Sequence, residues 1–189
     1  MKIPAVCGLV VLALSLPAQT IRVYVKDNVG VKPSDLWMAT EKAAELLAPA
    51  GIHVEWRRRE AGSLCSIAVH IIGDMPEGQH PKALAYAQAY EGVHITVLYV
   101  RVLSADPLWP QVTLGYVLAH EMTHLLQGIS RHSPTGVMKA NWTWADHIEM
   151  RRGRLALSPE DIDLIRMGMA SRESRLLLAG SLSRLGDSH

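Results

Sequence analysis

The chain alternates between segments whose apolar residues recur at every second position and segments in which they recur at every third or fourth. The first pattern predicts half-buried strands, and it occurs in residues 21–26, 52–56 and 67–72. The second pattern occupies residues 34–47, where Ser34 is a suitable N-cap, and predicts an amphipathic helix. An order of strand, helix, strand and strand predicts a mixed α/β sheet with a crossover helix.

The second half of the chain contains further segments of both kinds. Residues 93–103 carry alternating branched apolar side chains and predict a strand, whereas the alanine-rich residues 83–89 are compatible with a helix or an edge strand. Residues 113–127 have a helical period that ends at Gly128, and Ser158-Pro159-Glu160-Asp161 is typical of a helix start. A leucine-rich tail follows, as a last helix or a frayed end.

The N-terminal residues have the pattern of a signal peptide. Lys2 is followed by an uncharged stretch from Ile3 to Leu16, and Pro17-Ala18 then resembles a cleavage site. We therefore expect an exported protein, secreted or periplasmic, with a signal peptide at 1–18, a catalytic domain at 19–170 and a helical or flexible tail at 171–189. A stretch this short does not span a bilayer, which takes about 20 apolar residues, so we expect no membrane span after cleavage.

The charge and the length of the chain limit the classes of function that are possible. The 189 residues include 19 basic and 18 acidic side chains, and a chain this close to neutrality is not expected to bind nucleic acid. The length is that of one ordinary domain. It says nothing of the oligomeric state.

The segment His120-Glu121-Met122-Thr123-His124 carries the chemistry. Four helical steps of about 100° bring His124 nearly above His120, so both imidazoles can bind one ion. Zinc accepts neutral imidazole nitrogen and, in catalytic sites, leaves a position for water. Glu121 is then placed to take a proton from an attacking water, which predicts a hydrolase with one catalytic Zn²⁺ ion.

A third ligand must come from outside this helix. His132 is the first candidate, because Gly128 allows the chain to turn back toward His120 and His124. Asp146 and Glu149 are the alternatives, since other zinc hydrolases have a carboxylate as the third ligand.

With these residues in view, the chain resembles a metzincin zinc metallopeptidase, and within that group a matrixin-like catalytic domain. The likeness rests on HEMTHLLQGISRH, on Gly136-Val137-Met138, on residues 157–165 and on residues 83–97. It implies an α/β (α+β) fold: a mixed twisted sheet with an antiparallel edge strand, a crossover helix, an active-site helix and a C-terminal helix. It also implies that Met138 is the Met-turn residue, an apolar floor beneath the metal.

The resemblance also implies how a substrate binds, and the chain departs from the usual family signature in its spacing and at Tyr86. It makes residues 83–89 the edge strand, with Ala83, Ala85 and Ala87 at the site where an extended peptide or protein substrate pairs with the sheet. Glycine and the third histidine stand four and eight residues after His124, where the usual signature has three and six. Tyr86 stands where a structural-zinc histidine would be, so we expect no second zinc ion.

Two tryptophans complete the expected site. Trp142 and Trp144 follow the Met-turn segment and are expected in the pocket wall or the core.

The sequence thus predicts an exported zinc endopeptidase with His120, His124 and His132 as ligands and Glu121 as general base. Two alternatives stay open: a gluzincin-like hydrolase that uses Glu149 or Asp146, and an exported zinc-binding or interaction domain without turnover.

Overall fold

A computed structural model describes residues 19–57, 66–73, 83–88 and 93–186. The predicted signal peptide, residues 1–18, lies outside these ranges. Within them, five strands form one sheet: β1 (Gln19–Asp27), β2 (Ile52–Arg57), β3 (Ser66–Ile72), β4 (Ala85–Gln88) and β5 (His94–Leu98).

The sheet is mostly parallel and has the spatial order β2-β1-β3-β5-β4. β1 pairs in parallel with β2 and β3, and β3 pairs in parallel with β5, whereas β4 runs antiparallel to β5 at the edge. The helix α1 (Pro33–Leu47) provides the crossover between β1 and β2. The predicted mixed α/β fold, with its crossover helix and antiparallel edge strand, is confirmed.

Alternation along the strands makes one face of the sheet apolar. Val23, Val69 and Ile95 are fully buried on this face, and the helices α1 and α3 (Pro110–Gln127) belong to the same core. The two helices cross closely: a β-carbon added at Gly115 would lie 2.9 Å from the Ala39 carbonyl oxygen. Only glycine allows this approach without a shift of one helix.

The N-cap of α1 lies two residues before the predicted one, Ser34. The helix begins at Pro33, its N-cap is Lys32, and no side chain caps it. Proline suits the first helical position because its missing N–H is not needed there. Ser34 therefore lies inside the helix.

One strand prediction is wrong in its second half. Residues 93–103 were expected to form a continuous strand, but β5 ends at Leu98 and α2 (Tyr99–Ala105) begins at the next residue. Leu98 pairs with Ile72, the last residue of β3, so no neighbouring parallel strand continues past it. In the helix, Val102 becomes fully buried, which the alternation of branched residues did not indicate.

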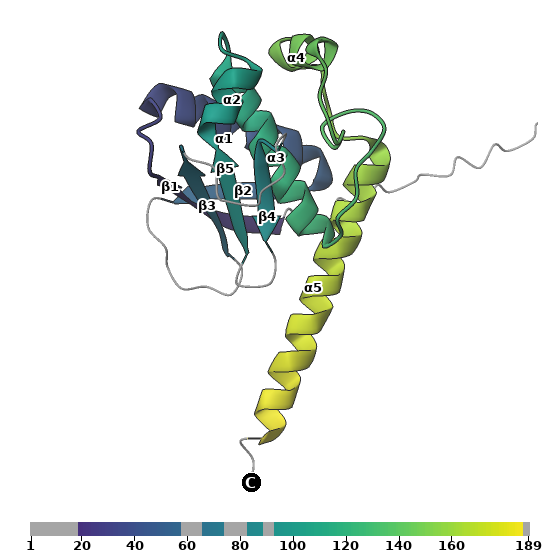
Figure 1. Ribbon diagram of the computed structural model, residues 1–189. Coiled ribbons are helices and arrows are strands. Elements are labelled where there is room, and N and C mark those ends of the chain that lie inside the picture. The colour runs from purple at the N-terminus through teal and green to yellow at the C-terminus, as the bar shows by residue number, and fades with distance from the viewer. Residues whose placement is uncertain (1–18, 58–65, 74–82, 89–92, 187–189) are drawn as a thin grey trace, which may run out of the picture.

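Two more helices complete the chain. The short α4 (Trp144–Arg151) was not expected; it begins with a capping box in which Thr143 and Asp146 each accept a hydrogen bond from the other's backbone N–H. The last helix, α5 (Pro159–Gly186), passes beside α3 and extends well beyond the sheet (Figure 1). Among the residues described, no helix is both long and apolar enough to cross a membrane.

Candidate metal centre and cleft

Helix α3 places two histidines of the motif on one face. The rings of His120 and His124 have their centroids 4.8 Å apart, and their Nε2 atoms are separated by 3.1 Å. Their position follows from local helix geometry, since side chains four residues apart lie one above the other.

Backbone carbonyl groups hold both rings by the opposite nitrogen. Nδ1 of His120 lies 2.8 Å from the Val137 carbonyl oxygen, and Nδ1 of His124 lies 3.4 Å from that of Ile129. When each Nδ1–H donates to its carbonyl, each Nε2 carries a lone pair. Two lone pairs only 3.1 Å apart repel each other unless a cation binds both. A hydrogen bond from the outer nitrogen is also the usual arrangement around metal-binding histidines.

The protonation of the pair suits a metal as well. Burial lowers the pKa of His120 to about 4, although the Val137 carbonyl raises it. Burial also lowers the pKa of His124, and a charge on His132 would lower it further. Both rings are therefore neutral at pH 7, which is the form that binds zinc.

His132 completes a cluster of three. Helix α3 ends at Gly128, whose φ of 71° turns the chain back, and the ring centroid of His132 lies 5.3 Å from that of His120 and 4.9 Å from that of His124. One nitrogen from each ring lies within 4.8 Å of the other two. The two additional residues in this turn, compared with the usual signature, therefore do not prevent the third histidine from reaching the pair.

The chain after His132 forms a closed loop beneath the cluster. The Ser133 N–H donates to the Met138 carbonyl at 2.7 Å, and the Val137 N–H donates to the Ala156 carbonyl at 3.0 Å. Gly136 has a φ of 77°, and a β-carbon there would lie 2.4 Å from the Ala156 oxygen. The side chain of Met138 is fully buried next to Val137, the residue that anchors His120.

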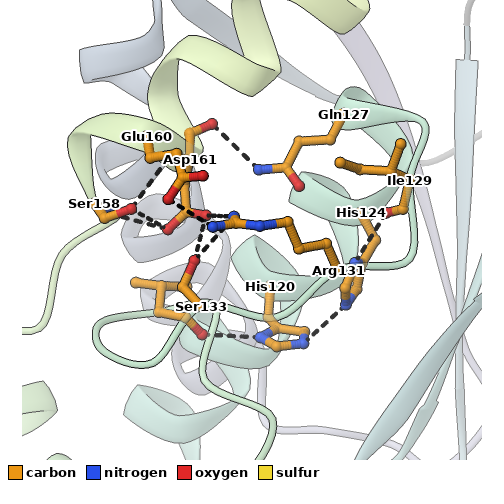
Figure 2. A network of polar contacts seen from close by, with 10 residues as sticks. His120, His124, Gln127, Ile129, Arg131, Ser133, Ser158, Glu160 and Asp161 are labelled. Atoms are coloured by element: carbon orange, nitrogen blue, oxygen red, sulfur yellow. Dashed lines mark hydrogen bonds and ion pairs between the residues drawn. The ribbon is translucent and has the colours of Figure 1, made fainter.

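Both residues that flank His132 are tied to Asp161 at the start of α5 (Figure 2). Ser133 Oγ donates to Asp161 Oδ1 at 2.6 Å, and the Arg131 guanidinium donates to the same oxygen at 3.1 Å. Ser158 donates to the other carboxylate oxygen through its hydroxyl and its backbone N–H. Burial opposes ionisation of Asp161, but the Ser133 and Ser158 hydrogen bonds and the Arg131 charge outweigh it and lower its pKa.

Glu121 lies between the two helix histidines in sequence and is 8% exposed. Burial raises the pKa of its carboxyl group to about 7. A carboxylate with a pKa near neutrality accepts and returns protons readily at physiological pH, which is what a general base needs. Desolvation alone is the cause, because no charged partner contributes to the shift.

The cluster opens into a cleft of about 1130 Å³. Its walls include all three histidines, Glu121, and, from the edge of the sheet, Ala83, Ala85 and Ala87.

The hydrogen bonds between β4 and β5 show which backbone groups of β4 are left to pair with a further strand. The Leu98 N–H donates to the Leu84 carbonyl, so residue 84 belongs to a hydrogen-bonded pair of the β4–β5 ladder. In an antiparallel ladder such pairs alternate, so the backbone groups of Ala85 and Ala87 point away from β5, toward the open edge. The Ala83 carbonyl accepts a hydrogen bond from Arg101 at 2.6 Å.

The two tryptophans have different positions. Trp142 lines the cleft, with its ring perpendicular to that of His120 at a centroid distance of 5.6 Å. Trp144 is 65% exposed and stacks against the Arg151 guanidinium, 4.8 Å from the ring centroid. The expectation that Trp144 belongs to the pocket wall or core is therefore wrong, because it is the first residue of α4 and faces solvent.

The alternative carboxylate ligands are engaged elsewhere. Asp146 accepts hydrogen bonds from Lys139 and Thr143, and Glu149 forms ion pairs with Arg152 and Arg154. Within the described part of the chain, the three histidines are the one group of three or more His, Cys, Asp or Glu side chains close enough to share an ion.

Sequence reasoning missed the residues that hold the loop. No sequence motif marks Arg131, Ser133 and Asp161 as residues that hold the loop of His132. The one available signal was the spacing of Ser158 and Asp161, which is that of a capping box, and it places them at a helix start without naming their partners in the loop.

Comparisons with known proteins support the fold. No protein-family model matches the chain, and no curated protein matches it. Among solved structures, an archaemetzincin from Methanopyrus kandleri superposes with a TM-score of 0.55 at 15% sequence identity, over 80% of this chain and 96% of that one. This likeness shows a metzincin-like fold. The narrower similarity to matrixins stays a prediction from the sequence.

Proposed function

We propose that this protein is an exported zinc-dependent endopeptidase with a single catalytic ion held by His120, His124 and His132. The observation that carries the proposal is the convergence of three imidazole nitrogens within 4.8 Å in a cleft that also contains Glu121. Three neutral nitrogen donors suit zinc and leave one coordination position for water or substrate. The archaemetzincin-like fold supports the same activity.

When bound, zinc would lower the pKa of water and polarise the carbonyl group of the scissile bond. Glu121 would act as the general base: it accepts a proton from the attacking water and then delivers it to the nitrogen of the leaving amine. Its burial and raised pKa support both steps, because the carboxyl group exchanges a proton near neutral pH. The buried Met138 would provide the apolar floor of the site.

The edge strand β4 would hold the substrate. The backbone groups of Ala85 and Ala87 face the open edge, so an extended peptide would add a strand beside them. Their small side chains leave space in the cleft. Binding of this kind selects an extended main chain, which suits an endopeptidase acting on peptide or protein substrates. Export is proposed from the N-terminal apolar segment of the sequence.

The substitution Glu121→Gln tests the proposal. We expect the variant to bind zinc with the same stoichiometry as the original protein and to cleave a quenched fluorescent peptide at least about 100-fold more slowly, the usual contribution of a general base. The matched control is Glu173→Gln, an exposed glutamate on α5, which should change neither quantity.

The outcomes separate the proposed function from its alternatives. A Glu121→Gln variant that cleaves as fast as the original protein would refute the mechanism. An original protein that binds one zinc ion and cleaves no peptide would instead indicate a zinc-binding domain without turnover. Loss of zinc from Glu149→Ala, but not from His132→Ala, would indicate a gluzincin-like site.

A further inference from the structure

The wall of the cleft contains a buried histidine that the proposed mechanism does not use. His147, on α4, is 7% exposed and lines the same cleft as the histidine cluster. Its Nδ1 lies 3.4 Å from the Thr113 hydroxyl and 3.9 Å from a carboxylate oxygen of Asp106. The position of Thr113 on α3 locates His147 relative to the metal centre.

Thr113 and His120 are seven residues apart, which is close to two turns of α3. The two residues therefore share a face, and their separation along the helix axis is about 10 Å. Val117 lies between them on α3 and lines the cleft, as do Trp142 and Ala140 from the loop after Met138. Apolar side chains thus line part of the cleft that the histidine cluster shares with His147, beside the polar Lys139 and Asn141 of the same loop.

The partners of His147 determine what its ring can offer. Asp106 is 2% exposed and also pairs with Arg151, whose guanidinium nitrogen lies 3.2 Å from Asp106 Oδ2. The Asp106 carboxylate, 3.9 Å from Nδ1, favours the neutral tautomer whose proton is on Nδ1, and this tautomer leaves the lone pair on Nε2. Among the residues that the structure describes, none forms a hydrogen bond to this Nε2.

The charges around His147 favour an uncharged ligand. Burial is the largest cause and lowers the pKa of His147; the Asp106 charge raises it, the Arg151 charge lowers it, and the Asp146 charge raises it. The ring is therefore neutral at pH 7, while Asp106 and Arg151 offset each other. A cationic side chain would find no unpaired carboxylate beside His147, because Asp106 is paired with Arg151, and an anionic one would face the imidazole lone pair.

We propose that His147 is a specificity residue and that this pocket takes a long, uncharged substrate side chain with a hydrogen-bond donor at its tip, tyrosine in particular. The inference rests on the proposed function and deepens it. The tyrosine ring would pack between Val117 and Trp142, and its hydroxyl would donate to Nε2 of His147. Phenylalanine would fill the same space and leave this acceptor without a partner.

Two peptides that differ by one hydroxyl group test the pocket. Otherwise identical quenched peptides, with tyrosine or phenylalanine directly after the scissile bond, are compared by their kcat/KM. We expect the original protein to prefer tyrosine by about 3- to 10-fold, the worth of one hydrogen bond in a partly open site. A ratio near one, a preference for phenylalanine, or a stronger preference for lysine at this position would overturn the proposal.

Variants assign the preference to His147. In His147→Leu the ratio of tyrosine to phenylalanine should fall to about one, and in His147→Gln, which keeps an acceptor at a similar reach, part of it should remain. His53→Leu, an exposed histidine on β2, is the matched control and should leave the ratio unchanged. An unchanged ratio in folded His147→Leu would also refute the assignment. Should that variant not fold, the ratio in the original protein and in His147→Gln decides.

A binding measurement separates this inference from the proposed function. The zinc-loaded Glu121→Gln variant is titrated with the same two peptides by calorimetry, and the tyrosine peptide should bind about 3- to 10-fold more tightly. Tighter tyrosine binding without hydrolysis by the original protein would refute the peptidase and retain the pocket. Hydrolysis and binding without preference would retain the peptidase and refute the pocket.

Discussion

The two parts of the histidine cluster are held in different ways. His120 and His124 lie on α3, a helix with most of its residues buried, and their relative position depends on the regular hydrogen bonding of one element. His132 lies in a loop and is exposed, and the residues on either side of it are bound to Asp161 of α5. The helix pair is thus set locally, whereas the third histidine depends on a helix about 30 residues further along the chain.

The anchoring contacts lie on both sides of His132. Because Arg131 and Ser133 are bound to Asp161 of α5, the chain on either side of the His132 ring is fixed. The ring reaches the cluster although it stands two residues further from His124 than in the usual signature.

The largest expected effect comes from removal of a ligand in either part. We expect His124→Ala and His132→Ala each to lower zinc affinity by at least about 100-fold, more than the 10- to 100-fold typical of an outer-shell partner. Competition with a chromogenic chelator measures this, and His53→Ala provides the surface control. An unchanged zinc affinity in His132→Ala would show that the loop histidine does not bind zinc. The comparison between the helix histidines and the loop histidine would then not apply to the metal site.

The anchor itself is tested by Asp161→Asn. An amide cannot accept all the hydrogen bonds that Arg131, Ser133 and Ser158 donate to the carboxylate, so the loop should lose its fixed position. We expect zinc affinity to fall by about 10-fold, in the range of outer-shell partners. Chelator competition again provides the measurement, with thermal unfolding of the metal-free protein alongside.

Asp163→Asn is the matched control for Asp161→Asn. Asp163 lies on the same helix, its side chain is 69% exposed, and it pairs only with Arg166 on the surface. Surface ion pairs contribute little, so zinc affinity and unfolding temperature should stay close to those of the original protein. Equal losses in both variants would indicate a general effect of charge on α5 and not a specific anchor.

An effect on stability, and a smaller one on zinc binding, is expected where α5 approaches α3. A β-carbon at Gly168 would lie 2.2 Å from the Leu126 carbonyl oxygen, so Gly168→Ala forces the two helices apart. We expect a loss of about 1–3 kcal/mol in the free energy of unfolding, as for other overpacked sites. Denaturant titration measures it, and Ser171→Ala, an exposed site on the same helix, is the control. No loss in Gly168→Ala would show that the helices separate freely at this point.

Two helices, α2 and α4, could not be predicted from the sequence, and each has a physical reason. α2 was missed because Tyr99, Val100 and Val102 favour a strand by composition, and only the end of the β3–β5 ladder at Leu98 shows that no strand can continue. α4 was missed because it is short and its start depends on the Thr143 and Asp146 capping box, a pattern too common to be decisive alone.

The sequence by itself determined the first three strands with their crossover helix, the helix that carries His120, Glu121 and His124, and the nature of the donor atoms. These follow from neighbours within one turn of a helix or one step of a strand. Only the tertiary structure decided that His132 joins the pair, that Asp161 holds its loop, and that His147 lines the cleft. Those contacts join residues far apart in the chain, and no local periodicity encodes the distance between them.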